Sequence, residues 1–252
     1  MDSAPLLQLQ NVSFEYPQKG KEPLHALRGV SLSVRAGECV GIVGESGCGK
    51  TTLANVSLGL LQPSTGCVLV EGLEMRGSSS WRAAYTKIHA VFQNPSGSFD
   101  PRRTLGYSAA EPLRNAGVGK ATARERVLEL FAECGLDAEL LNRYPHQVSG
   151  GQCQRAAIAR ALALEPKLLV CDEATSSLDA TVQRKVASLL CSLQRKKGTA
   201  LLFISHDISL VGQMCETMAV MRAGEFVEQG ATAQILESPK HPYTQLLIDS
   251  VL

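Results

Sequence analysis

A large charge of one sign is missing from this sequence. Lys and Arg number 25 and Asp and Glu number 24, which leaves a formal net charge of +1. Because nucleic-acid binding depends on clustered Lys and Arg, we expect no nucleic-acid partner. No apolar run approaches the ~20 residues of a membrane-spanning helix, and residues 1–5 lack the basic and apolar regions of a signal peptide. Any membrane role is therefore expected to be peripheral.

A C-x-x-C pair is also missing, although the chain has 8 cysteines. The cysteines are scattered and several lie within apolar runs, as expected of reduced thiols in a cytoplasmic protein. Cys48 lies beside Lys50 and near the start of a predicted helix, and both features favour the thiolate. We therefore predict that Cys48 is the thiol most sensitive to alkylation.

The most informative stretch that is present is GESGCGKT, at residues 44–51. It fits the phosphate-loop pattern, in which backbone N–H groups wrap a triphosphate. A buried strand is predicted before it, and Leu53, Val56 and Leu60 recur at helical spacing until Pro63. A chance glycine-rich turn would not explain this strand and helix. Because a helix N-terminus offers unpaired N–H groups to phosphate, the expected nucleotide-binding residues are Gly44, Glu45, Ser46, Gly47, Cys48, Gly49, Lys50, Thr51 and Thr52.

Two side chains of this stretch have roles of their own in the pattern. Lys50 is expected to reach the β- and γ-phosphates. The Thr51 hydroxyl is the expected ligand of Mg²⁺, a hard cation that takes oxygen donors. The pattern therefore predicts a nucleoside triphosphate and Mg²⁺ at one site.

Residues 6–34 carry alternating segments with turn residues between them, which predicts an antiparallel sheet with one face in water. Phe14 and Tyr16 lie in this sheet, upstream of the phosphate loop. An aromatic ring there would stack on adenine, or would be a surface aromatic of an edge strand. Spacing alone does not separate these interpretations.

Residues 68–70 and 88–92 are predicted strands, and the second runs directly into Gln93. Ligands of open α/β sheets bind at the carboxyl ends of the strands. Gln93 is therefore expected to touch the metal or the attacking water, and an ordinary turn residue is the alternative.

Residues 168–171 predict a buried strand that ends in Asp172 and Glu173. Carboxylates are costly at such a place unless something uses them. Asp172 is expected to hold Mg²⁺, and Glu173 to polarise the water that attacks the γ-phosphate. An acidic strand cap is the alternative.

Between these strands the pattern becomes helical over residues 101–144, with no strand signal. One apolar stripe there is ended by a glycine: Val127, Leu130, Phe131 and Cys134, then Gly135. We predict a single domain, residues 1–252, in which the nucleotide-binding α/β core covers 1–92 and 161–252 and an inserted helical subdomain covers 93–160.

Residues 148–152, VSGGQ, open an apolar helix that is predicted over 156–164. Ser149 and Gln152 have the spacing of a capping box, which explains part of the pattern as a helix start. Gly150 and Gly151 are harder to explain that way, because glycine weakens a helix by roughly 1 kcal/mol relative to alanine. The glycines fit a backbone that approaches a phosphate.

Two polar residues remain near predicted strands and helices. Asp179 precedes a helix with one apolar face, so it belongs to the site or is only an N-cap. His206 follows a predicted strand, 201–204, where it would contact the γ-phosphate, although a lone histidine commonly has no special role. After it, residues 218–227 predict a hairpin.

The order and spacing of these motifs, from Tyr16 to Thr244, resemble those of the ATP-binding-cassette transporter ATPases. The resemblance implies an α/β fold, a P-loop ATPase core with a parallel sheet, an N-terminal antiparallel β subdomain and an inserted α-helical subdomain. It implies ATP and Mg²⁺ as ligands, Tyr16 as the adenine-stacking ring, and residues 148–152 as the family signature, in which Val148 replaces the usual leucine.

The resemblance also assigns roles to individual residues. The implied catalytic residues are Glu173, His206, Lys50 and Gln93, and the implied metal ligands are Thr51, Gln93 and Asp172. Two further segments are implied to contact the nucleotide. The signature contributes Ser149, Gly150, Gly151 and Gln152, and the inter-subunit loop Ser177-Leu178-Asp179 contributes Asp179.

Within that family, residues 44–50, 94–112 and 241–244 resemble the peptide and nickel importer branch. The chain has Phe99-Asp100-Pro101-Arg102 where members of the branch commonly show a Leu-Asn-Pro-Arg-like segment. Longer members continue past the His-Pro-Tyr motif, some with a cysteine cluster. Because the sequence ends at Leu252, no metal cluster is expected.

The implied function is that of an ATP-hydrolysing subunit of an importer for peptides or nickel complexes, at the cytoplasmic face of the membrane. Expected partners are transmembrane permease subunits, a solute-binding protein that acts indirectly, and a second ATPase subunit, in a heterodimer rather than a homodimer. The helical subdomain carries Ser149 away from its own phosphate loop, so we expect each site to be shared between two subunits.

Two rival functions are kept. The first is a soluble cassette ATPase that acts on nucleic acid or ribosomes, but such proteins usually carry two cassettes or a long coiled-coil insertion. The second is a small-molecule P-loop kinase, in which residues 149–151 would have no purpose.

Overall fold

A mostly parallel sheet forms the centre of the structure. The computed structural model describes residues 4–20, 22–174 and 179–250. Within these residues, a six-stranded sheet, here called the main sheet, has the order β10-β9-β3-β8-β7-β6. Its strands are β3 (Cys39–Val43), β6 (Ile88–Phe92), β7 (Leu168–Asp172), β8 (Ala200–Ser205), β9 (Thr217–Arg222) and β10 (Glu225–Ala231). All pair in parallel except β10, which returns antiparallel to β9 as the predicted hairpin.

The main sheet is buried on both faces. Along β3, Val40 and Ile42 belong to a core shared with the N-terminal strands, whereas Cys39 and Val43 belong to a second core shared with the later helices. Successive side chains of a strand point to opposite faces. Two buried faces explain why these strands are continuous apolar runs in the sequence.

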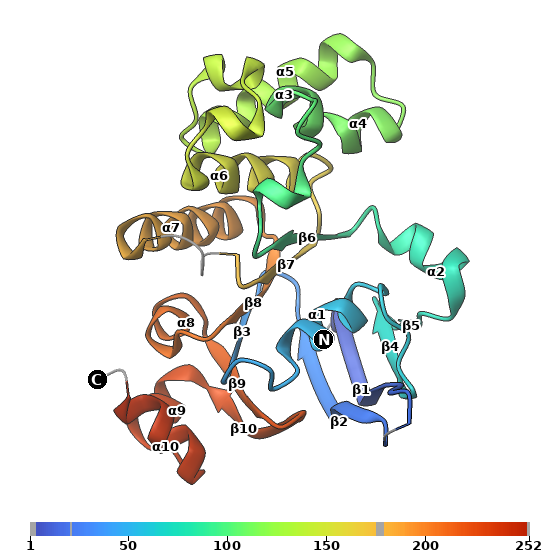
Figure 1. Ribbon diagram of the computed structural model, residues 1–252, viewed down its shortest axis with the longest axis vertical. Coiled ribbons are helices and arrows are strands. Elements are labelled where there is room, and N and C mark those ends of the chain that lie inside the picture. Colours follow the sequence, from blue (N-terminus) through green and yellow to red (C-terminus); the bar gives the residue numbers. More distant parts are fainter. Residues whose placement is uncertain (1–3, 21, 175–178, 251–252) are drawn as a thin grey trace.

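A second, antiparallel sheet packs on one side of the main sheet (Figure 1). Its order is β2-β1-β4-β5, with β1 (Leu7–Tyr16), β2 (Leu24–Val34), β4 (Thr65–Val70) and β5 (Leu73–Glu74). Leu7 lies opposite Val34 of β2 and opposite Val70 of β4. The predicted antiparallel sheet over residues 6–34 is confirmed, and β4 joins it from beyond the phosphate loop.

Helix α1 (Lys50–Ser57) follows the phosphate loop and is shorter than predicted. Leu53 and Val56 are buried as expected, but Leu60 lies outside the helix and is exposed. Gly59 has a φ of +68°, and a Cβ there would lie 2.2 Å from the Trp81 ring. The chain therefore leaves the helix through a glycine turn, before it reaches Pro63.

The segment between β6 and β7 is helical, as predicted, and forms the top of Figure 1. It contains α3 (Leu105–Ala109), α4 (Glu111–Asn115), α5 (Lys120–Glu133) and α6 (Gly150–Ala161), with short 3₁₀ turns at Ser96–Ser98, Ala138–Asn142 and Pro145–Gln147. The predicted stripe on α5 is buried, and Gly135 follows its end with a φ of +64°. Helix α6 ends at Ala161 rather than at residue 164. The subdomain boundaries at 93 and 160 stay a prediction.

The remaining helices are α2 (Gly77–Ala84), α7 (Ala180–Lys197), α8 (Ile208–Met214), α9 (Thr232–Glu237) and α10 (Pro242–Asp249). Helix α7 ends at Gly198, whose left-handed backbone suits glycine. In the part of the chain that the structure describes, no helix has both the length and the apolar character to cross a membrane.

Candidate functional site

Two glycines shape the phosphate loop between β3 and α1. Gly44 has a φ of +156°, and a Cβ there would lie 2.2 Å from the Met221 carbonyl oxygen. Gly49 has a φ of +113°, and its Cβ would lie 2.4 Å from the Ala26 carbonyl oxygen. A side chain at either position would force backbone apart, so the loop needs glycine at both.

Lys50 is held at the centre of this loop. Its side chain is 4% exposed, and its ammonium donates hydrogen bonds of 2.8 Å to the carbonyl oxygens of Gly44 and Glu45. The same nitrogen lies 3.8 Å from Glu173 Oε1. The predicted catalytic pair, Lys50 and Glu173, is therefore brought together.

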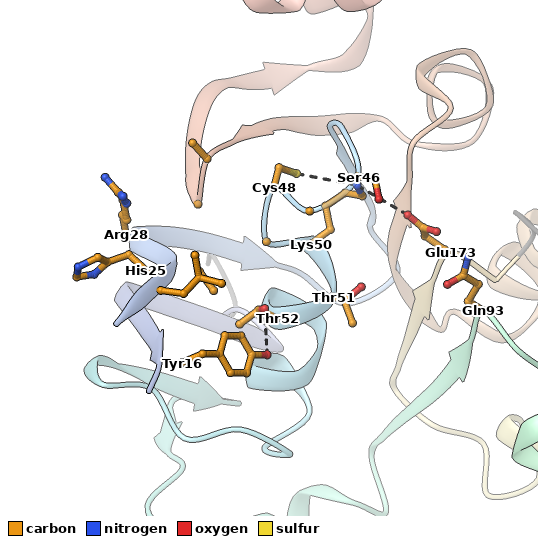
Figure 2. Close-up of a pocket in the computed structure, with 16 residues that line it drawn as sticks. Tyr16, His25, Arg28, Ser46, Cys48, Lys50, Thr51, Thr52, Gln93 and Glu173 are labelled. Atoms are coloured by element: carbon orange, nitrogen blue, oxygen red, sulfur yellow. Dashed lines mark hydrogen bonds and ion pairs between the residues drawn. The ribbon is translucent and has the colours of Figure 1, made fainter. Parts of the chain in front are cut away.

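A cavity of about 520 Å³ opens over the loop (Figure 2). Its lining includes predicted residues from four separate segments: Tyr16, Ser46 to Thr52, Gln93 and Glu173. In Figure 2, Gln93 and Glu173 lie to the right of the loop, and His25 and Arg28 lie to its left. The phosphate loop, Tyr16, Gln93 and Glu173 thus converge on one cavity.

The structure adds lining residues that the sequence did not indicate: Leu24, His25, Ala26, Arg28, Ala223 and Gly224. Backbone hydrogen bonds bring them to the loop. Gly224 N–H donates to the Cys48 carbonyl, and Arg28 N–H donates to the Gly224 carbonyl, both at 2.9 Å. The only signal for this contact was the glycine of the predicted hairpin, which does not say what the hairpin touches.

Tyr16 and Phe14 take different positions. Tyr16 is 38% exposed and lines the cavity, whereas Phe14 packs against the core with its ring edge-on to Tyr16, at 4.9 Å between centroids. The Tyr16 hydroxyl is 3.3 Å from Thr52 Oγ1. Of the two aromatics, Tyr16 is the one available to a base, and its stacking on adenine stays a prediction.

Asp172 is a buried carboxylate beside Thr51. Its residue is 4% exposed, and its Oδ1 has no hydrogen-bond partner among the described residues. Burial raises the pKa of Asp172, while a hydrogen bond with Thr51 and the charge of Lys50 oppose that rise. An orphaned buried oxygen next to a threonine hydroxyl is the donor set that Mg²⁺ prefers. These residues therefore fit the metal.

Glu173 lies just past the end of β7 in an unusual backbone conformation. Its φ is +47°, a region that residues other than glycine rarely adopt. Its N–H donates to the Ile204 carbonyl of β8 at 3.0 Å, which holds the strained residue in place. Strain of this kind collects at functional sites.

His206 follows β8 and lies next to Glu173. Its Nδ1 is 3.9 Å from Glu173 Oε1, and its side chain is more than half exposed. His206 does not itself line the cavity. The structure thus brings His206 to the predicted catalytic carboxylate and leaves it accessible to solvent.

The signature residues are elsewhere. Among the described residues that line the cavity, none comes from positions 149–152, and Asp179 is not among them. The Ser149–Gln152 capping box is present, with Ser149 Oγ accepting from Gln152 N–H at 3.2 Å and Gln152 Oε1 accepting from Ser149 N–H at 2.9 Å. A Cβ on Gly151 would lie 2.6 Å from Val182 Cγ1, so packing of α6 on α7 already requires that glycine.

Asp179 is the N-cap of α7, where its Oδ1 accepts from the N–H groups of Thr181 and Val182 at 3.1 and 3.0 Å. Ser177 and Leu178 of the predicted inter-subunit loop lie outside the described residues. Capping explains Asp179 locally, and a role toward nucleotide stays a prediction.

The prediction of a reactive Cys48 rests on a pKa argument that is wrong. The Cys48 side chain is buried, and burial raises its thiol pKa more strongly than the Lys50 charge lowers it. The helix start and the lysine are both present, but the sequence did not show that Cys48 is buried in a core with distant residues such as Leu27 and Met221.

Family comparisons agree with this geometry. Residues 27–176 match the family model described as ABC transporter, and residues 227–252 match the model described as Oligopeptide/dipeptide transporter, C-terminal region. The chain is 45% identical over 232 residues to the oligopeptide transport ATP-binding protein OppF of Escherichia coli, covering 90% of this chain and 70% of that protein.

Two further likenesses concern sequence and structure. The chain is 39% identical over 260 residues to the glutathione import ATP-binding protein GsiA of Salmonella paratyphi A, covering 100% of this chain and 42% of that protein. A dimeric ATP-binding cassette in a post-hydrolysis state, bound to ADP and Pi, superposes with a TM-score of 0.82 at 31% identity, covering 90% of this chain and 98% of that one.

Proposed function

The chain belongs to the ABC transporter family, as an ATPase subunit of the oligopeptide and dipeptide importer branch, and we propose that it drives peptide uptake through separate transmembrane subunits. The observation that carries the ATPase chemistry is the meeting of Lys50 and Glu173 at the phosphate loop. The C-terminal match over residues 227–252 favours an importer over a soluble ATPase that acts on nucleic acid.

The proposed chemistry is positioning and charge stabilisation. The N–H groups of the loop and the Lys50 ammonium would bind the phosphates and stabilise the charge that develops on the γ-phosphate. Glu173 would accept the proton of the attacking water. Gln93, which lines the same cavity, and His206, which lies beside Glu173, would orient that water and the γ-phosphate.

Thr51, Gln93 and Asp172 are the proposed ligands of Mg²⁺. The orphaned Oδ1 of Asp172 supports this assignment, because a buried carboxylate oxygen without a partner needs a cation or a donor. The metal would supply positive charge to the phosphate oxygens.

The site is proposed to be completed by a second ATPase subunit. Residues 149–152 and Asp179 do not line the cavity of their own chain, which supports a role toward a partner's nucleotide. The cassette bound to ADP and Pi described above was solved as a dimer. We expect a heterodimer rather than a homodimer.

The proposed permease contact is a groove of about 620 Å³ between the helical segment and the core. Its lining includes Tyr85, which follows α2, Phe92 at the end of β6, and Glu111 and Pro112 of α4. Phe92 lines this groove, and the next residue, Gln93, lines the ATP cavity. A permease helix seated in the groove would therefore contact the residue that precedes Gln93. Tyr85 and Phe92 are exposed large apolar side chains. The proposed location is the cytoplasmic face of the membrane.

The proposed cargo is a peptide, including short ones such as tripeptides. Relatives of the chain are named for oligopeptide and glutathione import, and glutathione is itself a tripeptide. Nickel complexes, the other predicted cargo, have no support from the relatives described here. The ATPase subunit would reach the solute-binding protein only indirectly, through the permease.

The test combines membrane copurification with uptake. A tagged chain, expressed with its own permease genes, should copurify with transmembrane subunits from detergent-solubilised membranes and should be needed for uptake of a labelled tripeptide. Lys50→Ala should copurify normally but abolish uptake, and Phe92→Asp should lose copurification while ATP binding stays. Recovery of ribosomes or RNA in place of membrane subunits, with tripeptide uptake intact in the deletion strain, would support the rival function.

A further inference from the structure

The last helix of the described chain touches the phosphate loop. Tyr243, in the first turn of α10, is 4% exposed, and its hydroxyl oxygen accepts a hydrogen bond of 3.0 Å from the N–H of Glu45. Glu45 is the second residue of the loop, so nearly two hundred residues of sequence separate the partners. The chemistry proposed for the site assigns no role to Tyr243.

The peptide groups around Glu45 are held from two sides. Tyr243 binds the Glu45 N–H, while the Lys50 ammonium binds the Glu45 carbonyl at 2.8 Å. With nucleotide bound, the Lys50 ammonium would be shared between the loop and a phosphate, whereas the Tyr243 hydroxyl would keep its bond to the Glu45 N–H. The residue before Glu45 is Gly44, which is conformationally permissive. A fixed N–H next to this glycine restricts the loop.

Tyr243 is itself held firmly. The Arg222 guanidinium lies 4.9 Å from the centre of its ring, and Arg222 follows Met221, whose carbonyl crowds Gly44. His241 Nδ1 accepts the Tyr243 N–H at 3.1 Å. Burial raises the pKa of the Tyr243 phenol, so the hydroxyl stays protonated at neutral pH.

Strand β10 anchors the segment that precedes Tyr243. The two carboxylate oxygens of Glu228 accept the N–H groups of Lys240 and His241, at 2.9 and 3.1 Å. The chain of contacts therefore runs from β10 through residues 240–243 to the phosphate loop. In the sequence, residues 241–244 indicated only the importer branch. In the structure, the same segment contacts the phosphate loop through Tyr243.

We infer that Tyr243 is a positioning residue that sets the affinity of the phosphate loop for nucleotide phosphates. The inference rests on the proposed function, because it takes residues 44–51 as the phosphate-binding loop. Tyr243 touches no reacting atom, and it acts through the backbone of Glu45. Its loss should affect ground-state and transition-state binding of the phosphates equally, which changes KM for ATP and spares kcat.

The test is Tyr243→Phe in the full chain, assembled with its partner subunits. The variant keeps the ring beneath Arg222 and removes only the acceptor of the Glu45 N–H. We expect KM for ATP to rise about 3- to 10-fold, the range for loss of one hydrogen bond, with kcat changed less than about twofold. Amide hydrogen exchange should increase in a peptide covering Glu45 and stay unchanged in peptides covering α10.

The matched control is Tyr107→Phe. Tyr107 is also stacked by an arginine, with Arg114 at 3.9 Å, but it is 47% exposed on α3 and lines neither the cavity nor the permease groove. KM, kcat and exchange near Glu45 should all match the wild type in this variant.

Two results would overturn the inference. One is an unchanged KM and unchanged exchange at Glu45 in Tyr243→Phe. The other is a fall in kcat accompanied by faster exchange throughout α10, which is the result expected of a merely structural tyrosine. Lys50→Ala tests the proposed function separately from the role of Tyr243. If ATP binding survives Lys50→Ala, the phosphate-loop assignment itself fails, whatever the result for Tyr243→Phe.

Discussion

The Lys50 ammonium lies 3.8 Å from the Glu173 carboxylate, at the point where the phosphate loop faces the end of β7. The pair is largely shielded from water, with side-chain exposures of 4% and 18%. Lys50 is also bonded to two loop carbonyls. Phosphate oxygens that enter the cavity would therefore compete with Glu173 and with the loop for the same ammonium group.

Glu173→Gln should separate hydrolysis from binding. The amide cannot accept the proton of the attacking water, so turnover should fall by roughly 10²- to 10⁴-fold. ATP affinity should stay or rise, because the amide no longer competes for Lys50. Light scattering should show ATP-dependent pairing with the partner ATPase. The control is Glu125→Gln on the exposed side of α5, which should keep full turnover. A Glu173→Gln protein that hydrolyses ATP at more than a tenth of the wild-type rate would remove Glu173 from the mechanism.

Asp172→Asn should stabilise the nucleotide-free protein and abolish its response to magnesium. An ionised carboxylate in this buried position is costly, so the melting temperature without nucleotide should rise, by about 2–4 °C for each ~1 kcal/mol gained. The wild type should be stabilised more by ATP with Mg²⁺ than by ATP with EDTA, and the variant should not distinguish the two. Thermal shift assays measure both quantities. A variant that melts below the wild type and still responds to Mg²⁺ would contradict the metal assignment.

Glu133→Gln should weaken the contact between α5 and α7 in a pH-dependent manner. Glu133 lies 2.8 Å from the Lys196 ammonium and 2.9 Å from the Lys197 ammonium. The hydrogen bond with Lys196 is the main cause that lowers the pKa of Glu133 below its ordinary value of 4.5, against an opposing effect of burial.

The pKa of Glu133 is lowered in the folded state. The ionised carboxylate therefore contributes stability that is present above pH 4.5 and is lost as the pH falls through the folded-state pKa. Wild type and Glu133→Gln should therefore differ at pH 7, by about 1 kcal/mol or less for a partly exposed pair, and converge in acid. Urea unfolding at several pH values measures this. A difference that grows in acid would contradict the assigned ion pairs.

Gly151→Ala tests whether the signature glycine serves packing or nucleotide. The added methyl group would meet Val182 at 2.6 Å, and overpacking of this kind costs about 1–3 kcal/mol. Adding Val182→Ala should remove the clash and restore the melting temperature. If Gly151 also approaches a partner's phosphate, the double variant should still fail in ATP-dependent pairing. Full pairing and turnover in the double variant would leave packing as the whole role of Gly151.

Cys67 should be alkylated before Cys48. Alkylation follows thiolate content and exposure, and Cys67 is partly exposed on β4, whereas Cys48 is buried with a raised pKa. Limited maleimide treatment followed by peptide mapping should find Cys67 labelled first, at a rate that ATP does not change. Early, ATP-sensitive labelling at Cys48 would instead favour the original prediction from the sequence.

Local patterns in the sequence were enough to predict most strands, the starts of α1, α6 and α7, and the polar residues at strand ends, whereas α2, α8, α9, α10 and β5 were not predicted. The GESGCGKT stretch predicted the loop and its lysine, and the Asp172-Glu173 pair at the end of an apolar run predicted carboxylates at the sheet edge. These predictions succeed because backbone geometry, capping and burial of a strand depend on near neighbours. Helix ends were predicted less well, since α1 stops where Gly59 packs on Trp81, a residue of another helix.

Only the tertiary structure decided which segments meet and how deeply side chains are covered. The contacts of Ala26 and Gly224 with the loop, and of Tyr243 with Glu45, join residues far apart in the chain. The burial that raises the Cys48 pKa also depends on distant segments, because Cys48 lies in one core with Leu27 and Met221. The sequence determined the chemistry of the site, because that chemistry depends on residue types in order, whereas the fit of the site depends on packing between elements, which no local pattern encodes.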